Sequence, residues 1–87
     1  MKTLEALRKE IDEIDHELLS ILAKRVDAVK RVGEFKNIQG LPVLDEKRRE
    51  EILTVIKEKA KGFHLSEKFI EELFAKIHDH AVELQKK

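Results

Sequence analysis

The chain has 87 residues, no cysteine, and 18 basic and 18 acidic residues, which give a formal net charge of zero. This length allows one small domain, expected to span residues 1–87. The lack of cysteine excludes a disulfide framework, a thiol nucleophile and a cysteine-based zinc site. The zero net charge disfavours a nucleic-acid partner, because domains that bind phosphate backbones usually carry a basic excess.

Hydropathy and composition indicate a soluble helical protein. No apolar run approaches the roughly 20 residues of a membrane span, and residues 1–5 lack the apolar stretch of a secretory signal. We therefore expect a cytoplasmic protein with no membrane partner. The charged fraction of 41%, with only one proline and three glycines, is typical of helices with salt-bridged solvent faces.

The first predicted helix begins at Leu4, after the capping residue Thr3, and covers about 34 residues. Its apolar residues follow heptad spacing as far as Phe35, and stop signals come together only at residues 37–42. At 1.5 Å per residue this helix is about 51 Å long, whereas a compact chain of this size is roughly 30 Å across. A second chain is expected to cover the overshooting apolar seam in a two-fold homodimer. The alternative is a long monomeric three-helix bundle.

Two shorter helices are predicted after it. The second starts at Asp45 and ends at Gly62, with a buried side formed by Ile52, Leu53, Val55, Ile56 and Ala60. The third follows the capping residue Ser66, and its apolar stripe consists of Ile70, Leu73, Phe74, Ile77, Ala81 and Leu84. The expected fold is all-α, with one long and two shorter helices per chain.

Arg25 interrupts the apolar seam of the first helix. A desolvated guanidinium needs an anion or a carboxylate partner. Taken alone, Arg25 is explained more simply as a polar residue that sets helix register, or as an arginine that snorkels to solvent. One helix face carries, at i, i+4, i+7 and i+11 spacing, Arg25, Val29, Val32 and Lys36. The two cations are about 16 Å apart along the axis, so their long side chains can hold a small dianion between them.

Three further polar residues can join such a site. Arg48 adds a third cation if the second helix folds back beside the end of the first. Gln85 lies on the apolar stripe of the third helix and can donate a hydrogen bond inward, although a frayed C-terminal glutamine is the simpler explanation. Arg8 lies about 25 Å from Arg25 along the same helix. The two arginines can therefore share a small ligand only across an antiparallel dimer.

The histidines give little support to other chemistry. His78 and His80 diverge on a helix, and His16 and His64 have no partner at a recognisable spacing. No zinc-type pattern, glycine-rich phosphate loop or Ser-His-Asp order is present. The sequence predicts no metal site.

Five short motifs follow one another in a fixed order: LRKEIDEID at 7–15, LAKR at 22–25, VGEFK at 32–36, PVLDEKR at 42–48 and ELQ at 83–85. In this order they resemble the all-helical (type II) chorismate mutase family over nearly the whole chain. The resemblance implies an intertwined homodimer of three-helix chains with two active sites. It also implies the rearrangement of chorismate to prephenate in aromatic amino-acid biosynthesis, without a cofactor.

The resemblance assigns three arginines to the substrate carboxylates. Arg8 would come from the partner chain and bind the side-chain carboxylate of chorismate. Arg25 and Arg48 would bind and frame the carboxylates from within the chain.

The remaining residues would act on the reacting bond and on the ring. Lys36 and Gln85 would hydrogen-bond the ether oxygen of the C–O bond that breaks, and Asp45 would help to hold the ring hydroxyl. The expected catalytic residues are Lys36, Gln85 and Arg25. The reaction is a single pericyclic step, so it needs orientation and fixed charges rather than a nucleophile, a general base or a metal.

Two positions depart from the family's usual pattern. Arg49 stands where a glutamate commonly follows the second-helix arginine to receive the ring hydroxyl. Ala81 stands where a small polar residue often precedes the glutamine by four positions. Val32, on the face shared by Arg25 and Lys36, is a further candidate lining residue.

Other functions are compatible with the same features. An isochorismate-pyruvate lyase on this scaffold needs the same cations, and its products, salicylate and pyruvate, would distinguish it. A non-catalytic helical dimerisation module explains the heptads but leaves the matched polar positions to coincidence. A regulatory or fused form of the mutase domain is a third alternative, although the start at Met1 and the end just past the last helix favour a free-standing enzyme.

Overall fold

The computed structural model describes residues 3–86, which form three helices: α1 (Leu4–Gln39), α2 (Glu46–Gly62) and α3 (Glu67–Gln85). The described residues contain no strand. The all-α prediction of one long and two shorter helices is therefore confirmed. No helix among the described residues combines the length and apolar character needed to cross a membrane.

Side-chain caps define where the helices begin. The Thr3 side chain accepts a hydrogen bond from the Ala6 N–H, and the Ser66 side chain accepts one from the Phe69 N–H. Asp45 caps α2 in the same way, so the first helical residue is Glu46 rather than Asp45. Each cap satisfies one of the backbone donors that a helix start leaves unpaired.

The end of α1 is fixed by Gly40. This residue has a left-handed conformation with a φ of 68°, which glycine adopts without the steric cost of a Cβ. Its N–H donates to the carbonyls of Asn37 and Lys36, and the Leu41 N–H donates to the Lys36 carbonyl at 2.8 Å. The helix thus runs to Gln39 and has 36 residues, two more than the heptad pattern predicts.

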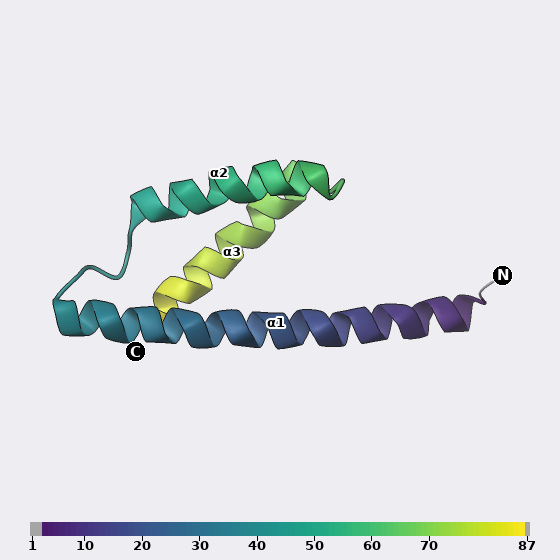
Figure 1. Cartoon of the computed structure of the whole chain (residues 1–87), viewed down its shortest axis with the longest axis horizontal. Coiled ribbons are helices and arrows are strands. Elements are labelled where there is room, and N and C mark those ends of the chain that lie inside the picture. The colour runs from purple at the N-terminus through teal and green to yellow at the C-terminus, as the bar shows by residue number, and fades with distance from the viewer. Residues whose placement is uncertain (1–2, 87) are drawn as a thin grey trace.

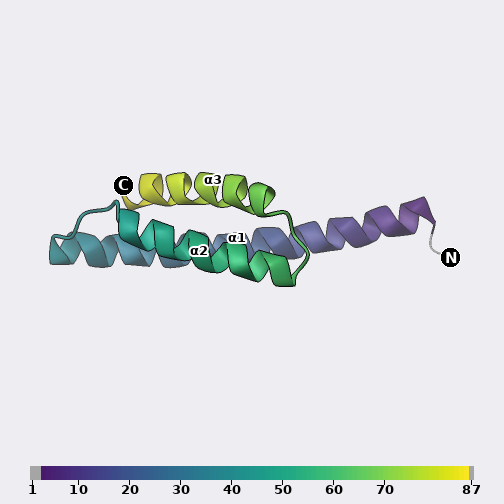
Figure 2. The same ribbon diagram turned by 90° about the horizontal axis from the view of Figure 1, so that it is seen from above.

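The third helix packs against both of the others, whereas in the described chain no Cα atom of α1 lies within 8 Å of a Cα atom of α2. Figure 1 shows α2 running back above α1, with α3 crossing diagonally between them. In the view from above, α1 and α2 overlap and α3 lies to one side (Figure 2). The space between α1 and α2 is therefore walled on one side by α3.

The buried core is small and lies along α3. Ala60 and Ile70 are the buried hydrophobic residues of the described chain, and His78 is its buried polar residue. Three inter-helix ion pairs join α2 to α3 among the described residues: Lys57 with Glu71, Arg49 with Asp79, and Lys61 with Glu67.

One predicted core residue of α2 is not buried. Val55 is 51% exposed, because it lies about 100° around the helix from Ile56 and points away from α3. The other predicted residues of that side, Ile52, Leu53, Ile56 and Ala60, are all at least partly buried.

The N-terminal half of α1 projects beyond the other two helices (Figure 1). Every residue from 4 to 21 is exposed, and Ile11, Ile14, Leu18 and Ile21 are each more than half exposed. The chain measures 57 × 24 × 15 Å. Its accessible surface is 7493 Å², whereas a compact monomer of 10.2 kDa is expected to expose about 5300 Å². The apolar seam predicted to require a partner is thus uncovered in the single chain.

Candidate active site

A cavity of about 360 Å³ lies where the three helices face one another. Every site residue that the sequence places within one chain lines it, namely Arg25, Lys36, Asp45, Arg48 and Gln85. The three further candidates Val32, Arg49 and Ala81 line it as well. Three segments far apart in the sequence therefore contribute to one space.

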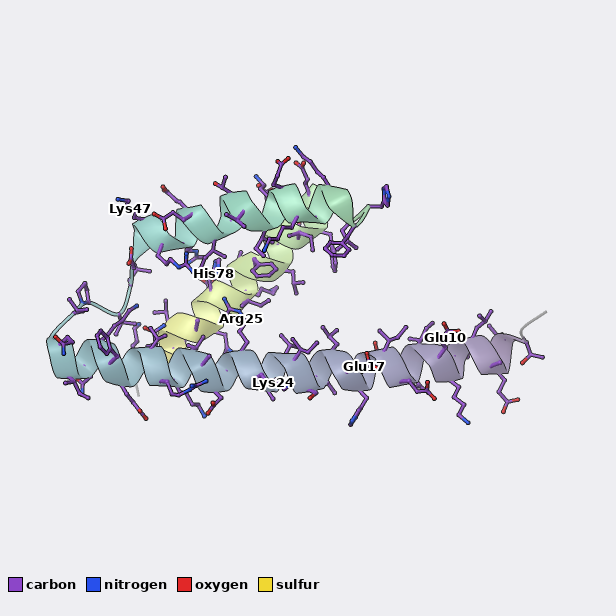
Figure 3. The ribbon with its side chains drawn as sticks, in the orientation of Figure 1. Glu10, Glu17, Lys24, Arg25, Lys47 and His78 are labelled. Atoms are coloured by element: carbon purple, nitrogen blue, oxygen red, sulfur yellow. The ribbon has the colours of Figure 1, made fainter. Side chains whose placement is uncertain are left out.

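Helix periodicity explains how each element presents its residues. On α1, the row that starts at Arg25 and ends at Lys36 faces the cavity. On α3, His78, Ala81 and Gln85 follow i, i+3 and i+7 spacing and form the opposing wall. In Figure 3, Arg25 and His78 both lie in the region that the three helices enclose.

The cavity is strongly cationic. Its lining includes one carboxylate, Asp45, and four cations: Arg25, Lys36, Arg48 and Arg49. The Asp45 carboxylate already accepts the Arg48 backbone N–H at 3.0 Å as the cap of α2. Within the described chain, neither Arg25 nor Lys36 forms an ion pair with a carboxylate. This excess of positive charge makes the cavity suited to a small polyanion.

Lys36 has a structural contact in addition to its place in the cavity. Its Nζ donates a hydrogen bond to the Val43 carbonyl at 2.8 Å, which ties the segment before α2 to the end of α1. An ammonium has three N–H donors, so two remain for a ligand. The contact fixes the position of a flexible side chain before any ligand binds.

Arg49 is attached to α3. Its Nη2 lies 3.0 Å from Oδ1 of Asp79 and donates to the Ala75 carbonyl at 3.4 Å. The position where the family commonly has a glutamate therefore holds a guanidinium that joins two walls of the cavity. A guanidinium has N–H donors only, so it offers no acceptor for a hydroxyl group.

Gly33 allows the end of α3 to approach α1 closely. A Cβ at this position would lie 3.0–3.2 Å from Cγ, Cα and Cβ of Gln85, which is too close for an unshifted helix. Gly33 is buried, although it lies in the middle of an otherwise exposed stretch of α1. The Oε1 atom of Gln85 is buried and has no hydrogen-bond partner within the described residues. The close contact with Gly33 thus fixes the last turn of α3, which carries the Gln85 amide. The amide oxygen is not used in a hydrogen bond within the described residues.

His78 is a cavity residue to which the sequence analysis assigned no role. It is only 7% exposed, and its ring lies edge-on to that of Phe74, with 5.9 Å between the ring centroids. Its Nε2 has no hydrogen-bond partner among the described residues. Burial lowers the pKa of His78, and the nearby charges of Arg25 and then Arg49 lower it further, against a smaller opposing effect of Asp79. The available signal was its spacing, because His78 lies four residues after Phe74 and seven before Gln85.

Arg8 is the one predicted site residue that does not line the cavity. It lies on the exposed N-terminal half of α1, about 25 Å from Arg25 along the helix. A single chain does not bring the two arginines together.

Comparison with known proteins identifies the family of the chain. The model of the family described as chorismate mutase type II matches residues 7–86. A chorismate mutase of Methanocaldococcus jannaschii is 34% identical over 99% of this chain and 87% of its own length. A T-protein of Enterobacter agglomerans is 35% identical over 85% of this chain and 20% of its own length. A bifunctional chorismate mutase/prephenate dehydratase of Aquifex aeolicus is 45% identical over 64% of this chain and 16% of its own length.

The chain thus spans most of the first relative and a fifth or less of the other two. The family match covers α2, α3, all of α1 except its first three residues, and every residue that lines the cavity. The chain therefore belongs to the type II chorismate mutase family.

Proposed function

We propose that this chain rearranges chorismate to prephenate in the cavity between α1, α2 and α3, as a homodimer with two equivalent sites. Family membership makes chorismate mutase the activity of the chain. The observation that carries the assignment to this cavity is the convergence of Arg25, Lys36, Arg48 and Gln85 from three helices on one space of about 360 Å³. The expected cytoplasmic location stays a prediction.

The charges of the cavity match those of the substrate. Chorismate carries two carboxylates, and guanidinium groups bind carboxylates through paired N–H donors. Arg25 and Arg48 approach the cavity from α1 and α2, so they can hold a dianion from two sides. The rearrangement requires the substrate in a folded conformer, and fixing that conformer removes a large entropic part of the barrier.

Lys36 and Gln85 are proposed to act on the ether oxygen. As the C–O bond breaks and the new C–C bond forms, negative charge develops on this oxygen. Donors that are already aimed at it stabilise the transition state more than the ground state. The contact of Lys36 with Val43 and that of Gln85 with Gly33 hold the two donors in place beforehand.

A second chain is proposed to complete each site. The uncovered apolar residues of α1 lie on the same N-terminal half as Arg8. An antiparallel, two-fold arrangement buries this seam and moves Arg8 of one chain toward the cavity of the other. The surface excess over a compact monomer, about 2200 Å², is of the size that a permanent dimer buries.

The purified protein should consume chorismate and produce prephenate at neutral pH, with no added metal or cofactor. Product identification by chromatography checks this prediction. Its control is isochorismate as substrate, since formation of salicylate and pyruvate would instead assign the lyase activity. A protein that converts neither compound would contradict the proposed function.

Replacing Arg25 or Lys36 by alanine should lower kcat/KM by about 10³-fold or more, because each removes a charge placed at the reacting dianion. Circular dichroism should show an unchanged helix content. Lys24→Ala is the matched control, since Lys24 is an exposed cation next to Arg25, and it should retain activity. A loss of less than about tenfold for Arg25→Ala would remove this residue from the site.

Arg8→Ala should lower activity strongly without removing any side chain from the cavity of its own chain. Mixing and reassociating equal amounts of the Arg8→Ala and Arg25→Ala proteins should restore about a quarter of wild-type activity. Half of the dimers are then mixed, and each has one intact site of two. Lys9→Ala, an exposed neighbour, is the control. Sedimentation equilibrium of a stable monomer, or no recovery on mixing, would refute the shared site.

Gly33→Ala should lower kcat by about tenfold or more while changing the unfolding midpoint little. The new Cβ would lie 3.0–3.2 Å from three atoms of Gln85, so the last turn of α3 must shift. The Gln85 side-chain amide then loses its alignment with the substrate. The helix propensity of alanine offsets part of the strain. Gly62→Ala is the control, because nothing lies within 4 Å of its Cβ position. Unchanged kcat would show that the position of Gln85 is not critical.

A further inference from the structure

His78 Nε2 is a buried polar atom that the reaction described above does not use. It lies in the cavity wall and has no hydrogen-bond partner among the described residues. Gln85 Oε1, the other such atom, is seven residues further along the same helix face, about 10 Å away along the axis. Burying a polar group without a partner is unfavourable. Both residues line the cavity, so a ligand bound there can supply the missing partner of His78 Nε2.

Charged groups from every surrounding helix face His78. Arg25 of α1 and Arg49 of α2 disfavour a protonated imidazole, whereas Asp79 of α3 favours it. Asp79 is itself paired with Arg49 at 3.0 Å, which limits its effect on the ring. The lining of the cavity has three further charged residues: Lys36, Arg48 and Asp45. In the ligand-free protein, burial and the charges of Arg25 and Arg49 keep the pKa of His78 below its ordinary value.

We propose that His78 is a substrate-binding residue that takes up a proton when the dianion enters the cavity. The proposal rests on the function proposed above. Two carboxylates in the cavity counteract the repulsion from Arg25 and Arg49, and a nearby negative charge favours protonated histidine. The resulting imidazolium donates its Nε2–H to the substrate as a charge-assisted hydrogen bond. The proton comes from solvent, and no bond of the substrate is changed by its transfer.

Proton uptake determines the sign of the pH dependence. The pKa of His78 is higher in the complex than in the free protein. Between these two values the complex holds a proton that the free protein lacks, so substrate affinity falls as pH rises through this window. The lower limit of this pH window is the pKa of His78 in the free protein, which lies below the ordinary histidine value. Its upper limit is the pKa of His78 in the complex. KM therefore rises with pH, while kcat does not follow, because the uncharged Gln85 amide needs no protonation.

The first test compares the wild type with His78→Gln, which keeps a polar side chain that cannot take up a proton. Wild-type KM for chorismate should rise about tenfold between about pH 6 and about pH 8. The KM of His78→Gln should be independent of pH and close to the alkaline wild-type value. His80→Gln is the matched control, because His80 is an exposed imidazole on the same helix, and it should behave like the wild type. Parallel KM profiles for wild type and His78→Gln would overturn the proposal.

The second test uses the wild type alone and remains decisive if His78→Gln does not fold. Calorimetry of prephenate binding in two buffers of different ionisation enthalpy should show uptake of about one proton per site. Ring-carbon NMR should show the pKa of His78 rising when prephenate binds, and that of His80 staying constant. If the protein turns over chorismate but takes up no proton on binding, only the proposed role of His78 is refuted. A wild type without chorismate turnover would refute the proposed function, and this inference with it.

Discussion

The contacts of α3 determine the geometry of the whole chain. This helix packs against both α1 and α2, whose backbones do not approach each other closely within the described residues. On the α1 side, Gly33 permits direct approach to the backbone of Gln85. On the α2 side, ion pairs from Lys57 and Arg49 reach α3. The distance between α1 and α2 is thus set by α3, and the cavity is the space that this separation leaves open.

Stability and activity depend on the same surface of α1. The C-terminal part of the helix packs on α3 and supplies Arg25 and Lys36 to the cavity. The N-terminal part carries the exposed apolar seam together with Arg8. In the proposed dimer, burial of that seam supplies the free energy of association, and Arg8 is positioned by it. A small chain with two buried hydrophobic residues has little other source of stability.

Much of the fold could be predicted from local sequence features. Thr3 and Ser66 cap helices because their side chains accept backbone N–H groups nearby, and Gly40 ends α1 because of its left-handed conformation. The shared face of Arg25 and Lys36 follows from helix periodicity alone. The grouping of these residues with Asp45, Arg48 and Gln85 came from the family resemblance, and all five line one cavity in the structure. The dimer stays a prediction.

The features that sequence reasoning missed arise where α3 crosses the other helices. Two of these features are contacts between residues more than 20 positions apart: Arg49 with Asp79, and Gly33 with Gln85. The third, the burial of His78, depends on packing of the same kind. No local pattern encodes the crossing point of two helices. His78 appeared unremarkable beside His80, because neighbouring histidines on a helix look alike until one face is covered.

Arg49 and His78 together alter the charge balance of the cavity. A cation at residue 49, in place of the glutamate that the family commonly has, increases the repulsion among Arg25, Lys36 and Arg48 when no dianion is bound. Pairing with Asp79 moderates this repulsion. A permanently charged residue at position 78 would increase it again, whereas the pKa of His78 lies below its ordinary value in the free protein, and the proposed protonation occurs only beside an anion. A titratable side chain at position 78 is therefore compatible with the cavity both with and without a bound dianion. A lysine or arginine at the same position is not.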